Sequence, residues 1–300
     1  MPNDIDQRVR QRAFEFLEKL TIEHGDVLPY WELHEGFGFE GVRVPLLGPQ
    51  GIFKPKILDF PLSITTSPNS PYSDSFSLDG FLHYKYRGID PKHRDNVGLR
   101  DVMSRSISLV YLHGIAKGRY VAAWPVFIVS DNPSALTFTV AVDEKRKIDT
   151  SEHPQIKDDV AAIRRRYATA AVLIRLHQRT FREKVLHAYR HSCALCSLKH
   201  DSLLDAAHII PDSEEAGEPL VSNGLSLCKL HHAAFDQNIL GISPDFITEI
   251  RLDILHETDG PMLKHGLQEM HGLRISLPRR QEDKPDREAL AERYRLFKLA

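Results

Sequence analysis

The 300-residue chain has no long apolar run. No stretch approaches the roughly 18 consecutive apolar residues that a membrane-spanning helix needs. The first twenty residues contain acidic side chains in a charged amphipathic pattern, which is not the pattern of a secretory signal. The sequence therefore predicts a cytoplasmic protein with no membrane partner.

The chain also lacks an excess of charge of one sign. Its formal net charge is −2 and its pI is about 6.8, so no global field attracts it to polyanions. Basic residues do gather locally, in the run 164–166 and between residues 179 and 199. Such clusters fit either a nucleic-acid contact or a solvated helix face. The apolar fraction of 42% and the charged fraction of 27% are those of a folded globular protein.

Cysteine is scarce, and the odd count of three argues against a disulfide framework. Cys193 and Cys196 form a C-x2-C pair, while Cys228 and His231 form a C-x2-H pair. The two pairs together offer four thiolate or imidazole ligands, the set that a closed tetrahedral zinc site uses. We therefore expect a structural zinc ion that joins the two segments.

Periodicity divides the chain into an α+β arrangement. Helical spacing predicts a helix over residues 6–22, an almost continuous helix over 157–190 and a closing helix over 286–300. Short apolar runs with Gly and Pro turns predict strands between residues 57 and 142, with a short helix within 95–106. We expect a curved β-barrel domain over residues 1–150, a helical linker over 151–180 and a second domain over 181–300.

His231 is followed directly by His232, and one metal site does not need both. Neighbouring helix residues point about 100° apart, so His232 faces a different surface if His231 faces the zinc. His208 lies upstream in an apolar, strand-like run, and Asn223 lies between them. Each histidine alone fits a buried core residue, but the set suggests a second site.

The segments LDAAHIIP, SNGL and LCKLHHAAFD resemble the HNH nuclease family over about residues 180–245. The resemblance implies a ββα-metal fold, two strands and a helix around a divalent cation, here stapled by zinc. The His, Asn and His that give the family its name correspond to His208, Asn223 and His232. It implies that His208 is the general base and that His232 holds a catalytic Mg²⁺ or Mn²⁺. Asn223 would then orient the imidazole or its loop, the alternative being a plain Asn-Gly turn.

One position departs from the family pattern. Many HNH enzymes carry an acidic or histidine metal ligand directly before the base, whereas this chain has Ala207. Asp205 is the nearest acid and is a candidate ligand, although regular strand alternation would put it on the opposite face from His208. Asp236 lies one helical turn after His232 and is a candidate partner of that ring, or a cap of the helix end.

Residues 83–129 resemble the SET- and RING-associated (SRA) domain, a curved barrel related to PUA domains. The resemblance rests on an aromatic run before Arg-Gly-x-Asp, then Asp-Asn-x-x-Leu, an apolar strand and Gly-x-Tyr. It implies a DNA reader that flips a modified cytosine into a pocket of aromatic faces and one polar group. The matching positions are Tyr84, Tyr86 and Asp90, although two tyrosines on one strand face equally suit a barrel core.

The whole-chain pattern resembles bacterial restriction endonucleases with a recognition domain fused to a C-terminal HNH domain. It implies cleavage of double-stranded DNA that carries 5-methyl- or 5-hydroxymethylcytosine. Two alternatives remain: a catalytically inactive, zinc-stabilised reader of modified DNA, and an HNH nuclease of another specificity that nicks DNA or cuts RNA. Because cutting both strands usually takes two active sites, a homodimer is also expected.

Overall fold

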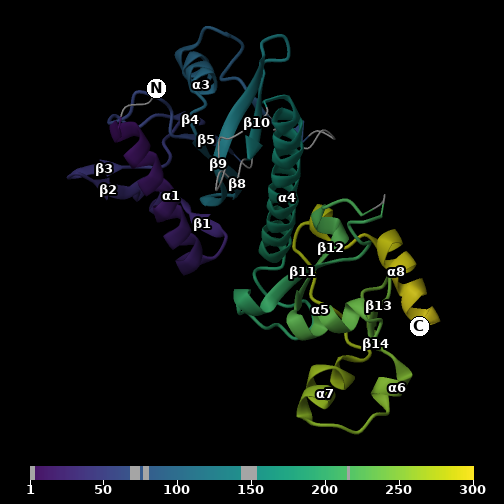
Figure 1. Ribbon diagram of the computed structural model, residues 1–300. Helices are drawn as coiled ribbons and strands as arrows, with labels where there is room; N and C mark the ends of the chain where they lie inside the picture. The colour runs from purple at the N-terminus through teal and green to yellow at the C-terminus, as the bar shows by residue number, and fades with distance from the viewer. Residues whose placement is uncertain (1–3, 68–74, 77–80, 143–153, 215–216) are drawn as a thin grey trace. The chain divides into compact units, whose positions relative to one another are not determined.

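The computed structural model describes residues 4–67, 75–76, 81–142, 154–214 and 217–300 (Figure 1). The chain forms two compact units, residues 1–179 and 180–300, and each has a hydrophobic core of its own. None of the helices in the described ranges is long and apolar enough to cross a membrane.

An eight-stranded sheet, curved into a half-barrel, forms the centre of the first unit (Figure 1). Its strands are β1 (Val27–Pro29), β4 (Ile52–Phe53), β5 (Ser63–Thr66), β6 (Ser75–Phe76), β7 (Leu82–Lys85), β8 (Leu109–Ala116), β9 (Arg119–Asn132) and β10 (Thr137–Val142). Their order is β4-β5-β8-β9-β10-β7-β6, with β1 also paired to β9. The β5–β8 pair is parallel and the other pairs are antiparallel.

The central strands carry apolar side chains on both sides, and both faces of this sheet are therefore buried. On β8, Leu109 and Tyr111 belong to one core, while Val110 and Leu112 belong to another. Helix α3 (Arg94–Ser104) contributes to the first core and α1 (Asp4–His24) to the second. The short elements α2 (Tyr30–Glu35), β2 (Phe37–Phe39) and β3 (Val42–Val44) follow β1 along the chain.

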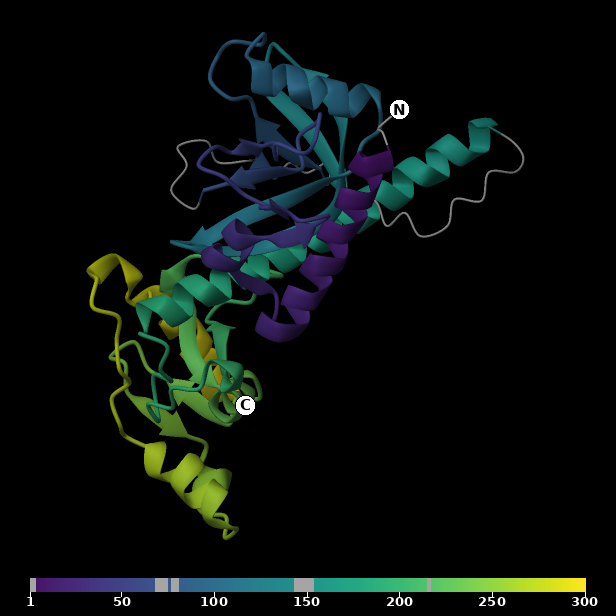
Figure 2. The same ribbon diagram turned by 90° about the vertical axis from the view of Figure 1, so that its left-hand side faces the viewer.

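The helix α4 (Pro154–Ala188) is continuous across the boundary of the two units (Figure 2). Within the first unit, Leu176 is buried in the core and the hydroxyl of Thr169 accepts a hydrogen bond from the backbone N–H of Val142 at 2.8 Å. Within the second unit, Phe181 and Val185 are buried in its core. The sequence prediction of a long helix here is confirmed, as are the opening helix, the helix within 95–106 and the closing helix.

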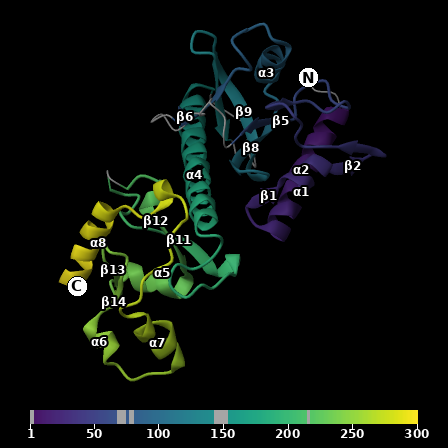
Figure 3. The ribbon, with the colours of Figure 1, turned by 180° about the vertical axis from the view of Figure 1, so that it is seen from behind.

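After the end of α4, the second unit contains a ββα element (Figure 3). Strands β11 (Leu204–His208) and β12 (Gly224–Cys228) pair antiparallel, from Leu204 opposite Cys228 to His208 opposite Gly224, and α5 (Lys229–Asp236) follows directly. The rest of the unit comprises β13 (Leu240–Ile242), β14 (Thr248–Ile250), α6 (Leu252–Leu255), α7 (Pro261–Gly266) and α8 (Arg287–Leu299), with 3-10 turns at Asp201–Leu203, Val221–Asn223, Gln268–Met270 and Gln281–Asp283. Asp286 caps α8 by accepting from the backbone N–H groups of Glu288 and Ala289.

Candidate functional site

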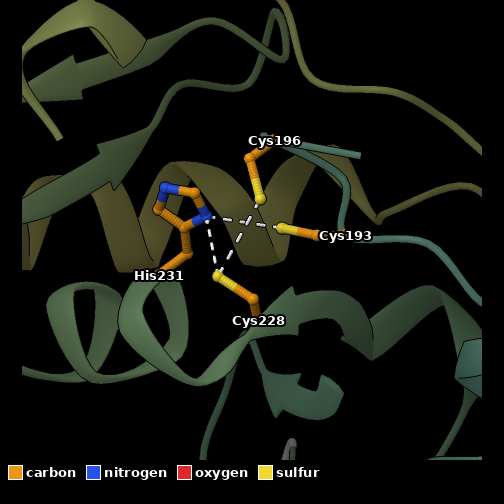
Figure 4. Close-up of side chains that lie close together, drawn as sticks. All are labelled: Cys193, Cys196, Cys228 and His231. Atoms are coloured by element: carbon orange, nitrogen blue, oxygen red, sulfur yellow. Dashed lines mark hydrogen bonds between the residues drawn. The ribbon is translucent and has the colours of Figure 1, made fainter. Parts of the chain in front are cut away.

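Cys193, Cys196, Cys228 and His231 converge on one point, as the sequence predicted (Figure 4). Their ligand atoms all lie within 4.8 Å of one another. The Nδ1 atom of His231 is 3.4 Å from the sulfur of Cys193 and 3.2 Å from that of Cys228, and the Cys196 and Cys228 sulfurs are 4.0 Å apart. Tetrahedral zinc with thiolate ligands holds sulfurs about 3.8 Å apart. The four residues therefore form a possible metal site consistent with zinc.

His231 also contacts a segment far along the chain. Its Nε2 atom lies 2.7 Å from the backbone carbonyl oxygen of Gly266, at the end of α7. With Nδ1 facing the sulfurs, Nε2 carries the proton and donates to this carbonyl, which fixes the ring for metal binding. Burial lowers the pKa of His231, but hydrogen bonds with Cys193 and Cys228 outweigh it and raise the pKa to about 10. Without metal the cluster therefore holds protons that zinc would displace.

His231 and His232 face different surroundings, as their neighbouring positions on a helix require. His231 is buried, whereas the side chain of His232 is 27% exposed. The His232 ring lies between two carboxylates. Its Nδ1 atom is 3.5 Å from Oδ2 of Asp205, and its Nε2 atom is 3.3 Å from Oδ2 of Asp236. Asp236 thus lies beside His232, at the spacing of four residues that brings side chains together on a helix.

His208 ends β11, with its ring stacked on Phe181 of α4 at 4.0 Å between centroids and 15° between planes. Its Nε2 atom is buried and has no hydrogen-bond partner among the residues that the structure describes. Burial lowers the pKa of His208; the charge of His232 lowers it further, while Asp212 and Asp236 raise it. The net direction is downward, so this imidazole is neutral at physiological pH.

Asn223 holds the loop that follows His208 rather than contacting the ring. Its side chain accepts from the backbone N–H of Ile210 at 2.9 Å and donates to the carbonyl oxygens of Ile210 at 3.0 Å and Glu218 at 3.1 Å. The backbone carbonyl of Asn223 also accepts from the N–H of Ile209 at 3.0 Å. These bonds fix where β11 ends, and therefore where His208 stands.

Gly224 begins β12 and is not the second residue of a turn. A Cβ there would lie 2.4 Å from Cγ2 of Val185 and 2.9 Å from Cζ of Phe181. Its φ of −128° is ordinary extended backbone, so this glycine is required by space and not by conformation. The Asn-Gly pair therefore combines a loop anchor with a close approach to the ring that supports His208.

Ala207, at the position where the resemblance implied an acidic or histidine metal ligand, is fully buried in the core of the second unit. The nearest acid, Asp205, contacts His232 and also accepts from Nζ of Lys229 at 3.3 Å. Three contacts were not found from the sequence: Phe181 under His208, Gly266 beside His231, and Asp212 near His208. Of these three contacts, only the one with Asp212 had a sign in the local sequence, because Asp212 lies four residues after His208.

In the first unit, Tyr84 and Tyr86 lie in the core and also line a cavity of about 360 Å³. The hydroxyl of Tyr86 donates a hydrogen bond to Asp131 and accepts one from Arg100 at 2.9 Å. The ring of Tyr86 stacks on Phe138. The remaining lining residues are Pro49, Gln50, Gly51, Ile52, Thr65, Thr66, Ser67, Lys85, Arg87 and Gly88. Asp90 does not line the cavity; its side chain accepts from the backbone N–H of Lys92 at 2.8 Å.

The chain is similar to a solved structure and, within the second unit, to a family model. No curated protein matches the chain. A solved structure titled "Modification dependent TagI restriction endonuclease" is similar at 15% sequence identity and a TM-score of 0.28, over 78% of this chain and 80% of that one. Residues 193–243, which include the four-residue metal site, His208 and His232, match the family model described as HNH endonuclease.

Proposed function

We propose that this protein is a metal-dependent endonuclease that hydrolyses double-stranded DNA carrying modified cytosine. The observation that carries the nuclease part is that the HNH match covers a neutral, partly buried histidine, His208, together with a second histidine, His232, that is paired with Asp236. Phosphodiester hydrolysis needs an activated water and stabilisation of charge on the phosphate and the leaving oxygen.

His208 is the proposed general base. Its lowered pKa keeps the imidazole able to accept a proton at neutral pH. Because Nε2 is buried, Nδ1 is the ring nitrogen available to a water. Phe181 holds the ring from one side, and Asn223 holds the backbone that follows it. Both supports limit the directions in which His208 can turn.

His232 and Asp236 are the proposed holders of the catalytic cation. A nitrogen and a carboxylate oxygen 3.3 Å apart suit neighbouring ligands of Mg²⁺ or Mn²⁺, which keep waters at their other positions. Within the described residues, the Cys₃His group is the one cluster of three or more such ligands this close together, so the proposed second ion would have two protein ligands and complete its coordination with waters and the phosphate. When bound, the cation would polarise the phosphate and stabilise the departing oxygen.

Asp205, which the sequence offered as a candidate metal ligand, is here the proposed orienting partner of His232. Both imidazole nitrogens face a carboxylate, and a ring that binds metal through one nitrogen commonly donates from the other. Asp236, and not Asp205, is among the charges that act on His208. The general base and the cation must act on the same phosphate, so we assign Nε2 of His232 and Asp236 as the metal ligands.

The cavity of the first unit is the proposed reader of the modified base. Its volume is within the range of small-ligand sites, and an aromatic wall beside Gln50, Lys85 and Arg87 suits a polar ring. The Tyr86 hydroxyl is already bonded to Asp131 and Arg100 and is therefore not the reading group. Double-strand cleavage would take two active sites, so we propose that the enzyme acts as a homodimer.

Parallel plasmids test this function directly. Wild-type protein with Mg²⁺ or Mn²⁺ is incubated with plasmids that are unmodified, 5-methylated or 5-hydroxymethylated at cytosine. We expect linear product from a modified plasmid and none from the unmodified one. Equal cutting of all three would reject the modified-base part and leave the nuclease part standing. Binding of modified DNA without cleavage would instead identify an inactive reader.

A filled cavity tests the reader separately. Gln50 lines the cavity, so Gln50→Trp should reduce discrimination between modified and unmodified plasmid. Gln11, which is exposed on α1, provides the matched control Gln11→Trp. If both variants discriminated as well as wild type, the cavity would not be the reading site.

A further inference from the structure

The second unit contains a cleft of about 280 Å³ that the proposed chemistry does not use. It lies beside the zinc loop, which we define as residues 193–199. It is lined by residues 189–192, which directly follow α4, by the zinc loop, and by the segment 276–277. Its lining residues are Tyr189, Arg190, Ser192, Ser197, Lys199, Ser276 and Leu277.

The charge of this cleft is uncompensated. Arg190 and Lys199 are both exposed, and neither forms an ion pair with a residue in the described part of the chain. No acidic residue is among the described residues that line the cleft. Arg182, by contrast, donates to the backbone carbonyl oxygens of Asp201 and Leu204. Two free cations at one concave site favour an anion.

Hydroxyl groups complete the donor set. Ser192, Ser197 and Ser276 line the cleft, and their side chains form no hydrogen bond to residues that the structure describes. Ser192 and Ser197 directly flank the metal-site cysteines, while the backbone N–H of Ser276 donates to the carbonyl of Ala194 at 2.8 Å. The loop that carries Cys193 and Cys196, together with the Ser276–Ala194 hydrogen bond, therefore brings these three serines to one cleft. A guanidinium, an ammonium and several hydroxyls suit the tetrahedral oxygens of a phosphate.

We propose that this cleft binds a backbone phosphate of DNA. The identification of DNA as the source of the phosphate rests on the proposed function, whereas the anion site rests on the cleft alone. A phosphate contact here would position the duplex without reading its sequence. The rival interpretation is that Arg190 and Lys199 only offset the negative charge of a zinc ion bound to three thiolates.

The test compares two double variants that remove the same charge. Arg190→Gln with Lys199→Gln empties the cleft of cations, and Arg295→Gln with Lys298→Gln removes two exposed cations of α8 that are paired with Glu292 and Glu249. Binding of a fluorescent duplex is measured by anisotropy over a salt series, in a His208→Ala background that prevents cutting. The cleft variant should bind DNA about tenfold more weakly at low salt. The negative slope of log K against log salt should become less steep by about 1.

The outcomes separate the cleft from the nuclease. Equal affinity and slope for the two double variants, or no binding of DNA by the parent protein, would overturn the proposal. Loss of zinc from the cleft variant would support the charge-offset interpretation and also overturn it. If inorganic phosphate raised the Tm of wild type but not of the cleft variant, while DNA binding were unchanged, the site would take a small phosphate and not DNA. If the cleft variant showed the predicted loss of slope but wild-type protein cut no plasmid, the cleft proposal would be supported and the nuclease proposal rejected.

Discussion

Oδ2 of Asp205 lies 3.5 Å from Nδ1 of His232, although the two residues are 27 positions apart. The contact leaves Nε2 of His232 facing Asp236 at 3.3 Å. An imidazole between two carboxylates can donate to one side and bind a cation on the other. In the proposed function this arrangement is a cation site distinct from the Cys₃His group, which includes the adjacent His231.

Asp205→Ala should weaken the catalytic cation without disturbing zinc. Loss of an orienting carboxylate commonly costs about 10- to 100-fold in metal affinity, because the ring is no longer held in one tautomer. Titration calorimetry with Mn²⁺ measures this affinity, and metal analysis measures zinc. Asp245→Ala is the matched control, since Asp245 is exposed and paired with Arg287. Unchanged Mn²⁺ affinity in Asp205→Ala would rule out the orienting role.

The adjacent histidines should separate into two phenotypes. His231→Ala removes one of four ligands and the contact with Gly266, so it should lose zinc and much of the folded second unit. His232→Ala should keep one zinc per chain and its folded state, yet lose cleavage. Zinc analysis, thermal unfolding and plasmid cutting on both proteins check this. Retention of zinc by His231→Ala, or its loss from His232→Ala, would contradict the division between the two sites.

Gly224→Ala should disturb His208 through the ring beneath it. A Cβ at this position meets Val185 and Phe181, and overpacking of a core costs about 1–3 kcal/mol of stability. Displacement of Phe181 would also release the stacked imidazole, so cleavage should fall by more than the stability loss explains. Gly260→Ala is the control, because nothing lies within 4 Å of a Cβ there. A Gly224→Ala protein as stable and active as this control would refute the packing argument.

The acid limb of the cleavage rate should lie below pH 6.5. Burial lowers the pKa of His208 from its ordinary value of 6.5, so the neutral, proton-accepting form persists as the pH falls past that value. Activity is lost only when the ring protonates at the lower pKa. Asp212 opposes this shift, and Asp212→Asn should therefore move the limb to still lower pH. Single-turnover rates between pH 5 and 8 measure both; a limb above 6.5 would contradict a buried base.

The sequence predicted those parts of the site that depend on local spacing. Two C-x2-ligand pairs identified Cys193, Cys196, Cys228 and His231, because ligands on tight turns are close together in any fold. His231 and His232 are adjacent on a helix, so their side chains had to point in different directions, which also follows from local geometry. Long helices and the apolar strands of the first unit were likewise predicted from periodicity.

Contacts between distant segments could not be predicted in the same way. The acceptor of His231 is a backbone carbonyl 35 residues away, and a carbonyl has no sequence signature. The stack of Phe181 on His208 depends on how α4 crosses the β11–β12 hairpin. Strand alternation put Asp205 on the opposite face from His208, but that rule compares residues of one strand and could not predict the contact with His232 on α5.

Cleavage by His208→Ala is the most direct test of the nuclease assignment. The variant is compared with wild type on whichever plasmid wild type cuts, at neutral pH with Mn²⁺ and with one zinc per chain confirmed in both. Loss of a general base should lower the cleavage rate by about 10²–10⁴-fold while DNA affinity is retained. A His208→Ala protein that cuts at the wild-type rate would contradict the account.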